Sequence, residues 1–161
     1  MNEEIRQLIE AATRVELNVA KLYRFFHYKF PEDADFWWKL SMEEENHAAL
    51  LRSGEEYFLD SGDFPSELLV TSLELVTNLN TGLERILSQE SEISPSREFA
   101  FNFALKIEGL AGEVHFQQAM QKTENPSEAL KLFQSLNKTD KNHAGRIRSY
   151  MREKGIAITR D

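Results

Sequence analysis

The sequence predicts an all-α protein, a bundle of four long helices in a single domain that covers residues 1–161. Leu, Ala, Glu, Lys and Gln are abundant, and extended runs of β-branched residues are lacking, which favours helix over strand. Only 7 glycines and 4 prolines occur, and they separate long segments without breakers. In four of these segments apolar residues recur at spacings of three and four, the pattern of a helix with one buried face.

The first two helices are predicted over residues 2–30 and 33–59, with Pro31 between them because proline cannot continue a helix. Each helix carries one mainly apolar stripe with polar residues in its middle. On the first helix the stripe consists of Ile9, Ala12, Glu16, Val19, Ala20 and Tyr23. On the second it consists of Trp37, Leu40, Glu44, His47, Ala48 and Leu51.

A long, partly helical crossover is predicted over residues 66–90. It follows Gly62 and Pro65, which mark a turn, and it joins the first helix pair to the second. Its middle, residues 78–82 with the sequence Asn-Leu-Asn-Thr-Gly, is polar enough to break the helix.

The second pair of helices is predicted over residues 95–122 and 126–153. Ser94 and Asn125 each precede a proline, as an N-cap residue precedes proline at the first helical position, and Gly155 is placed as a C-cap. The two stripes again have polar centres. They consist of Phe101, Ala104, Leu105, Glu108, Ala111, Gly112 and His115, and of Phe133, Leu136, Asp140, His143, Ala144 and Ile147.

The polar residues on the four stripes form two similar sets. The first set is Glu16 and Tyr23, followed by the motif Glu44-x-x-His47; the second is Glu108 and His115, followed by Asp140-x-x-His143. A carboxylate and a histidine three residues apart lie one turn apart on the same helix face, so each pair can bind one cation. A carboxylate on an apolar face needs a counter-charge or a metal. Four carboxylates and two imidazoles from four helices are the ligands of a di-iron or di-manganese bundle.

Tyr23 and His115 lie two helical turns beyond the glutamate of their own helix, about 10.5 Å along the axis. That distance is too long for the same metal ion. Both residues are therefore predicted as hydrogen-bond donors that orient a ligand. His115 is the weaker candidate of the two, because it can equally be a core residue.

The chain resembles the ferritin-like superfamily and, within it, the rubrerythrin-type di-iron proteins without the rubredoxin domain. The resemblance spans roughly residues 5–150 and is carried by Val15–Tyr23, Leu40–Ala48, Ala104–Glu108 and Asp140–His143. It implies a four-helix bundle with an internal pseudo-two-fold axis and two iron ions, with manganese or zinc as possible substitutes. By position it implies that Glu16, Glu44, His47, Glu108, Asp140 and His143 bind the metal, with Tyr23 beside them. The activity implied is reduction of hydrogen peroxide, or oxidation of ferrous iron with dioxygen or peroxide.

Three departures from the family pattern bear on function. Asp140 stands where a glutamate is usual, which can weaken the second metal position. Ala111 stands where rubrerythrins carry a further glutamate. The chain has no cysteine, so no rubredoxin-type centre is present in it and a peroxidase would need an external electron donor.

Two other functions remain open. The same site can bind or sequester iron with little turnover, or the helices can form a structural module that has lost its metal. The segment around Asp140 is polar enough to lie on the surface, and a single buried histidine, such as His47 taken alone, is often a core residue. His27 is predicted to be structural or exposed.

The remaining expectations come from composition. A net charge of −8 argues against nucleic acid or an anionic membrane as partner. No apolar run long enough for a membrane span occurs, and the first residues, Met1–Ile5, lack the basic and apolar regions of a secretory signal, so a cytoplasmic location is expected. The aromatic residues can serve a homodimer interface.

Overall fold

The computed structural model describes residues 2–65, 68–69, 72–89, 92–110, 126–136 and 142–159. These ranges contain six α-helices and a short 3-10 helix: α1 (Asn2–Lys29), η1 (Pro31–Asp33), α2 (Ala34–Phe58), α3 (Leu73–Ser88), α4 (Arg97–Glu108), α6 (Glu128–Leu136) and α7 (His143–Lys154). No strand occurs in them, so the predicted all-α class is confirmed. Among the described residues, no helix is both long and apolar enough to cross a membrane.

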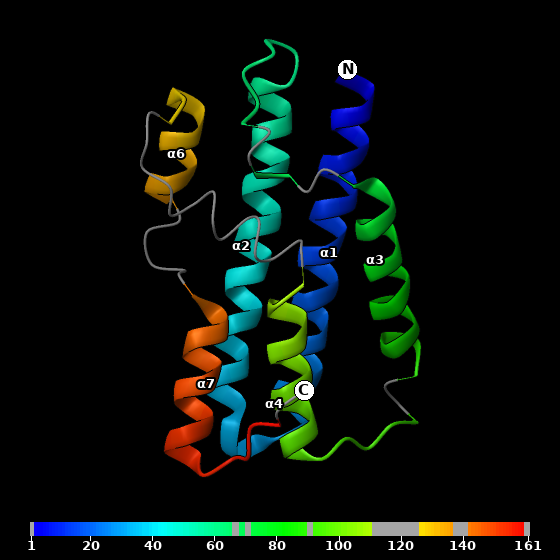
Figure 1. Cartoon of the computed structure of the whole chain (residues 1–161), viewed down its shortest axis with the longest axis vertical. Coiled ribbons are helices and arrows are strands. Elements are labelled where there is room, and N and C mark those ends of the chain that lie inside the picture. The colour runs from blue at the N-terminus through cyan, green and yellow to red at the C-terminus, as the bar shows by residue number, and fades with distance from the viewer. Residues whose placement is uncertain are drawn as a thin grey trace.

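Helices α1 and α2 form a long antiparallel hairpin (Figure 1). Their bounds agree with the predicted 2–30 and 33–59 to within a residue. The turn between them is η1, which begins at Pro31, because proline fits the first position of a helix. Within the hairpin the Ser41 hydroxyl donates a hydrogen bond to the Ala20 carbonyl, at 3.0 Å.

Helix α3 lies along α1 and occupies most of the predicted crossover (Figure 1). The polar residues 78–82 could have broken this helix, but α3 runs through them without interruption. Asn80 is buried, where its amide donates to the Ala11 carbonyl at 2.9 Å and its oxygen accepts from Asn18 at 2.9 Å. Its polar groups are therefore satisfied by α1 and do not compete with the helix backbone.

Helix α4 is shorter than predicted at both ends. Its N-cap is Ser96, whose hydroxyl accepts from the Phe99 N–H at 3.1 Å, so the predicted cap at Ser94 is wrong by one half-turn. The helix ends at Glu108, and a turn follows in which the Gly109 N–H donates to the Leu105 carbonyl at 3.1 Å. The rest of the predicted helix, residues 111–122, lies outside the described residues.

The predicted helix over 126–153 is two helices, α6 and α7. The interruption is visible at Asn142, which has a left-handed backbone with φ of 56° and whose side chain accepts from the Gly145 N–H at 2.9 Å. Asparagine tolerates this conformation better than most residues. Asn142 can therefore interrupt the helical pattern of the sequence and cap α7. The predicted C-cap at Gly155 is confirmed, with φ of 68°. The predicted cap at Asn125 lies outside the described residues.

Two apolar clusters hold these helices together. One surrounds Trp37 and contains residues of α1, α2, α3, α4 and α7. The other joins Ile9 of α1 and Leu51 of α2 to Phe133 of α6. On α2 the residues of the first cluster end at Leu40 and those of the second begin at Leu50, and the polar candidates stand between them.

A glycine marks the contact between α2 and α6. A Cβ added to Gly54 would overlap the ring of Phe133 and lie 2.9 Å from Phe64 Cε2. We expect Gly54→Ala to lower the free energy of unfolding by about 1–3 kcal/mol, because overpacking a core forces its side chains to shift. Gly82→Ala on α3 is the control, since nothing lies within 4 Å of its Cβ position. It should raise stability by roughly 0.5–1 kcal/mol through helix propensity. Urea denaturation of both variants measures the difference, and equal effects would contradict this packing.

Candidate metal centre

Five of the predicted ligands meet in the interior. Helix α1 contributes Glu16, α2 contributes Glu44 and His47, α4 contributes Glu108, and α7 contributes His143. Their side chains form two groups that could hold a metal ion: Glu16, Glu44 and His47, and Glu44, Glu108 and His143. Within each group the donor atoms lie within 4.8 Å of one another, and all five residues are buried. Glu44 belongs to both groups.

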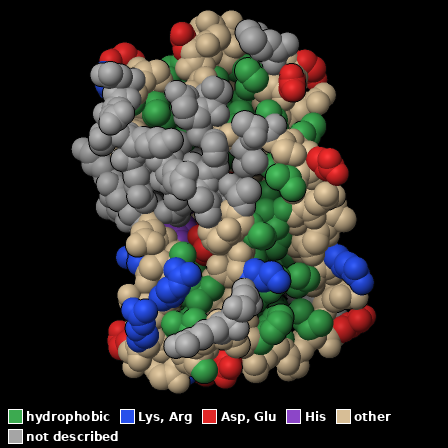
Figure 2. Space-filling model, in the orientation of Figure 1, with side chains coloured by type: hydrophobic (Ala, Val, Ile, Leu, Met, Phe, Trp, Pro, Cys, Tyr) green, Lys and Arg blue, Asp and Glu red, His purple; other side chains and the backbone are tan. Residues whose placement is uncertain are grey.

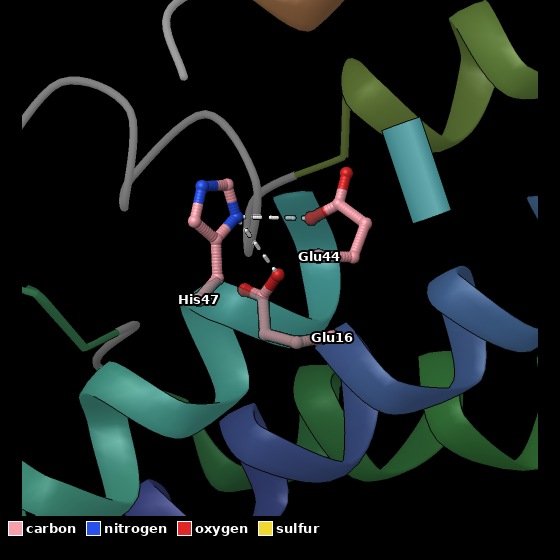
Figure 3. A group of neighbouring side chains, drawn as sticks. All are labelled: Glu16, Glu44 and His47. Atoms are coloured by element: carbon pink, nitrogen blue, oxygen red, sulfur yellow. Dashed lines mark hydrogen bonds and ion pairs between the residues drawn. The ribbon is translucent and has the colours of Figure 1, made fainter. Parts of the chain in front are cut away.

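The first group joins α1 to α2. His47 Nδ1 lies 3.0 Å from Glu44 Oε2, one turn earlier on the same helix, and 3.4 Å from Glu16 Oε2 across the hairpin. Figure 3 shows both carboxylates directed at this nitrogen. The predicted one-turn pairing of Glu44 with His47 is therefore present.

The second group joins α2 to α4 and α7. His143 Nδ1 lies 2.7 Å from Glu44 Oε1 and 3.5 Å from Glu108 Oε1. The two imidazole rings, of His47 and His143, face each other with their centroids 5.3 Å apart and their planes 14° apart. The two groups thus adjoin at Glu44, with one of its oxygens toward each imidazole.

Several of these short contacts lack hydrogen-bond geometry. Glu44 Oε1, Glu16 Oε2 and His143 Nδ1 are buried and make no hydrogen bond with the described residues, although charged neighbours lie close. A buried polar atom without a hydrogen bond is costly and needs an explanation. Donor atoms that converge without bonding to one another are the arrangement that a cation between them would satisfy.

The electrostatics of the group are strongly perturbed. Burial, reinforced by the neighbouring Glu44 carboxylate, raises the pKa of Glu16 to about 7. Burial alone would lower the pKa of His47, but its contacts with Glu16 and Glu44 outweigh burial and raise that pKa to about 10. For Glu44 burial acts upward, yet His143 and His47 outweigh it and hold the pKa well below its usual range. The carboxylates raise the pKa of His143 in the same way, against burial.

Tyr23 lies beside the second group and not beside the glutamate of its own helix. Its hydroxyl donates a hydrogen bond to Glu108 Oε1 at 2.5 Å, and both side chains are buried. The sequence predicted a donor that orients a ligand carboxylate, and the partner is the carboxylate of α4. This contact fixes one oxygen of Glu108.

Glu43 and Arg146 were not predicted at this site. Glu43 is 6% exposed, and its Oε2 lies 3.1 Å from His143 Nε2 and 2.5 Å from Arg146 Nη1. Burial raises the pKa of Glu43, but His143 and Arg146 outweigh it and lower the pKa. Glu43 thus contacts the nitrogen of His143 that faces away from Glu44. Glu43 was not predicted because it belongs to a run of three glutamates, Glu43–Glu45, of which only Glu44 lies on the apolar stripe.

Two predicted residues, Asp140 and His115, lie outside the described residues. Their roles stay predictions. In the described part of the chain, α7 begins at His143, directly after the left-handed Asn142. Ala111 is likewise outside the described part of the chain. His27 was predicted to be structural or exposed. It is half-buried, and its Nδ1 lies 2.9 Å from the Ala34 carbonyl at the α1–α2 turn, which is a structural contact.

No family model, no curated protein and no solved structure matches this chain.

Metal binding at this site should depend on pH in a defined direction. The folded pKa of His47 is about 10 against an ordinary 6.5, so its contribution to metal-free stability is present below pH 6.5 and lost as the pH rises to 10. A metal ion takes the place of protons on the imidazoles, so affinity should increase with pH. We expect the rise in melting temperature caused by Mn²⁺ to be larger at pH 8.5 than at pH 6. Calorimetry in two buffers of different ionisation enthalpy should detect proton release. Binding without proton release would contradict the assignment.

Proposed function

We propose that this chain is a two-metal carboxylate protein of the ferritin-like, rubrerythrin type, which binds two iron ions and consumes hydrogen peroxide or dioxygen. The observation that carries the proposal is the position of Glu44, which presents one oxygen to each of two buried groups of ligands. Carboxylates of this kind can join two metal ions. Manganese or zinc can occupy the same donors.

The donor set fits such a pair of cations. Glu16, His47 and Glu44 would hold one ion, and Glu44, Glu108 and His143 would hold the other. Carboxylate oxygen and imidazole nitrogen suit iron and manganese, and thiolate is absent. Asp140 stays a predicted ligand that would add a further negative charge. Iron bound here would supply the redox chemistry for which the side chains alone have no means.

The surrounding residues would position the ligands and keep water out. Tyr23 donates a hydrogen bond to Glu108, and Glu43 Oε2 lies 3.1 Å from the outer nitrogen of His143. Partners of this kind set the orientation and basicity of a metal ligand. Trp37, Leu40 and Leu51 on α2 are fully buried on either side of the site, so the carboxylates lie in a region of low dielectric.

One observation favours a second candidate, a structural module without metal. The buried charges can balance one another when both imidazoles and Glu16, whose pKa is raised to about 7, are protonated. The carboxylates of Glu43, Glu44 and Glu108 then face three cations, His47, His143 and Arg146. Such a network would be an ordinary, if costly, buried ion-pair cluster. A third candidate, iron sequestration with little turnover, uses the same ligands as the enzyme.

Metal loading followed by turnover separates the three. Protein loaded anaerobically with ferrous iron should retain about two ions per chain and consume peroxide repeatedly with an artificial electron donor. Glu16→Gln should lower both the iron content and the peroxide consumption, whereas Glu10→Gln, an exposed residue of the same helix, should change neither. Oxidation of ferrous iron in a single turnover only would favour sequestration. Failure to retain any metal would favour the ion-pair module and contradict the proposal.

A further inference from the structure

A continuous series of aromatic rings leads from the candidate metal centre toward the surface. Tyr23 donates to Glu108 and has its ring centroid 5.5 Å from that of Trp37. The ring centroids of Trp37 and Phe36 lie 5.6 Å apart. Phe36 stacks on Tyr150 with their centroids 4.0 Å apart and an interplanar angle of 20°. The series therefore crosses from α1 through α2 to α7. We call Tyr23, Trp37, Phe36 and Tyr150 the aromatic path.

The outer end of the aromatic path opens into a surface hollow of about 640 Å³, which is lined by Phe36 and Tyr150. The other two tyrosines of the chain, Tyr28 and Tyr57, are each 72% exposed and lie outside the path. Trp38, the second tryptophan, is 42% exposed and contacts His27. Only Trp37 of the two tryptophans therefore joins the site to the hollow.

Three residues of the aromatic path, Tyr23, Trp37 and Tyr150, suit one-electron transfer, and the Phe36 ring lies between Trp37 and Tyr150 without being oxidised itself. Tryptophan and tyrosine are the side chains most easily oxidised by one electron in a chain without cysteine. An oxidised phenol must lose its proton, and the Tyr150 hydroxyl already donates to Asp33 Oδ1 at 2.9 Å. The buried Trp37 N–H has no acceptor among the described residues, so at this step an electron can move without a proton.

The rim of the hollow is positively charged in a protein whose net charge is −8. Arg146 and Glu153 line it and are paired, with Glu43 and Lys154 respectively. Lys39, Arg148 and Arg152 also line it, all are exposed, and none forms an ion pair with a described residue. We call these three residues the basic patch. Figure 2 shows Lys and Arg side chains gathered at the lower left, where Figure 1 places α7. A local positive field of this kind attracts a negatively charged partner and raises its rate of association.

We propose that an acidic one-electron carrier protein docks on the basic patch and delivers electrons to the metal centre along the aromatic path. The inference rests on the proposed function, which needs an external donor. In one turnover, hydrogen peroxide takes up two electrons and two protons and becomes two water molecules, while two donor molecules are each oxidised by one electron. At Tyr150 the phenolic proton moves to Asp33 when the electron leaves and returns when the donor refills the ring.

The first test replaces the inner aromatic residue. In iron-loaded protein oxidised with peroxide, Trp37→Phe should slow re-reduction by a small donor about tenfold, and Trp38→Phe should leave it unchanged. Freeze-quenched samples without donor should show by electron paramagnetic resonance a radical on Tyr150, the outer end of the path, which Trp37→Phe removes and Trp38→Phe keeps. Tyr150→Phe, at the half-buried end, should also remove the radical and serves if Trp37→Phe folds poorly.

The second test changes the charge of the patch. At low ionic strength the double variant Lys39→Glu/Arg152→Glu should slow reduction by anionic ferrocyanide roughly tenfold or more, and accelerate reduction by cationic hexaammineruthenium(II). Arg52→Glu is the control, since it is an exposed cation of α2 outside the hollow. Iron binding and peroxide consumption with equal rates in Trp37→Phe and Trp38→Phe would overturn this inference alone. Absence of iron binding would overturn the proposed function and this inference with it.

Discussion

Replacing Glu44 with alanine is expected to abolish metal binding at both positions, because this carboxylate belongs to both groups of ligands. Loss of any other ligand would directly affect one group. We expect occupancy to fall below about 0.2 ions per chain, since neither remaining group keeps more than one carboxylate and one imidazole. Elemental analysis after loading with iron or manganese measures this directly.

The same substitution should also destabilise the metal-free protein. Glu44 lies 3.0 Å from His47 and 2.7 Å from His143, and removing it leaves two buried imidazoles without their shared carboxylate. Breaking a buried ion pair in this way costs about 3–5 kcal/mol. Glu44→Gln keeps the volume and removes only the charge, so it tests metal binding if Glu44→Ala does not fold.

The adjacent Glu45 provides the matched control. Glu45 is half-buried and pairs with Arg24, and it belongs to neither group of ligands. Glu45→Ala should retain full metal content and lose little stability, because exposed ion pairs contribute about 0–1 kcal/mol. Equal metal content in Glu44→Ala and Glu45→Ala would show that Glu44 is not a ligand.

Replacing Asp33 with alanine is expected to cause the largest loss of stability away from the metal centre. Asp33 is 1% exposed and accepts two hydrogen bonds from Arg97, at 2.6 and 2.7 Å, and one from Tyr150, at 2.9 Å. These bonds tie the α1–α2 turn to α4 and α7. Without the carboxylate, the Arg97 guanidinium loses a two-point partner and Tyr150 loses its acceptor, which should cost about 3–5 kcal/mol.

Asp35→Ala is the control for this prediction. Asp35 is exposed in the first turn of α2 and makes no ion pair with the described residues. Its removal should change the free energy of unfolding by less than about 0.5 kcal/mol. Thermal and urea denaturation of the two variants at neutral pH provide the comparison. A loss in Asp33→Ala no larger than that in Asp35→Ala would mean that the cluster does not hold the helices together.

The sequence predicted α1 and α2 well because their limits are chemically marked. Pro31 separates two long amphipathic segments. Each segment has polar residues in the middle of its apolar stripe, so these residues can meet when the two helices pack. Glu16, Glu44 and His47 were therefore found from spacing alone, and the structure brings them together.

The remaining differences arise where tertiary contacts override local preference. Asn80 looks like a helix breaker in sequence, but its amide is satisfied by α1. Asn142 looks like part of a continuous helix, yet it adopts a left-handed conformation and is the N-cap of α7, which begins at His143. Helical periodicity cannot show that an isolated asparagine will leave the helical conformation, so the predicted continuous helix over 126–153 was wrong at Asn142.

Glu43 was missed for a different reason. Its contacts are His143 and Arg146, and Arg146 is 103 residues further along the chain, so periodicity on α2 gives no information about them. The ion cluster of Asp33, Arg97 and Tyr150 was also not predicted, since its members are far apart in sequence. Such groups become visible only when the helix packing is known.

The central claim is that two cations share Glu44, and anomalous X-ray diffraction from crystals loaded with iron or manganese tests it most directly. We predict two anomalous peaks per chain on either side of the Glu44 carboxylate, one next to Glu16 and His47 and the other next to Glu108 and His143. A single well-occupied peak next to His47 would retain one half of the site and refute the shared carboxylate. No peak within ligand distance of Glu44, in crystals grown at a pH where the imidazoles can give up their protons, would contradict the claim altogether.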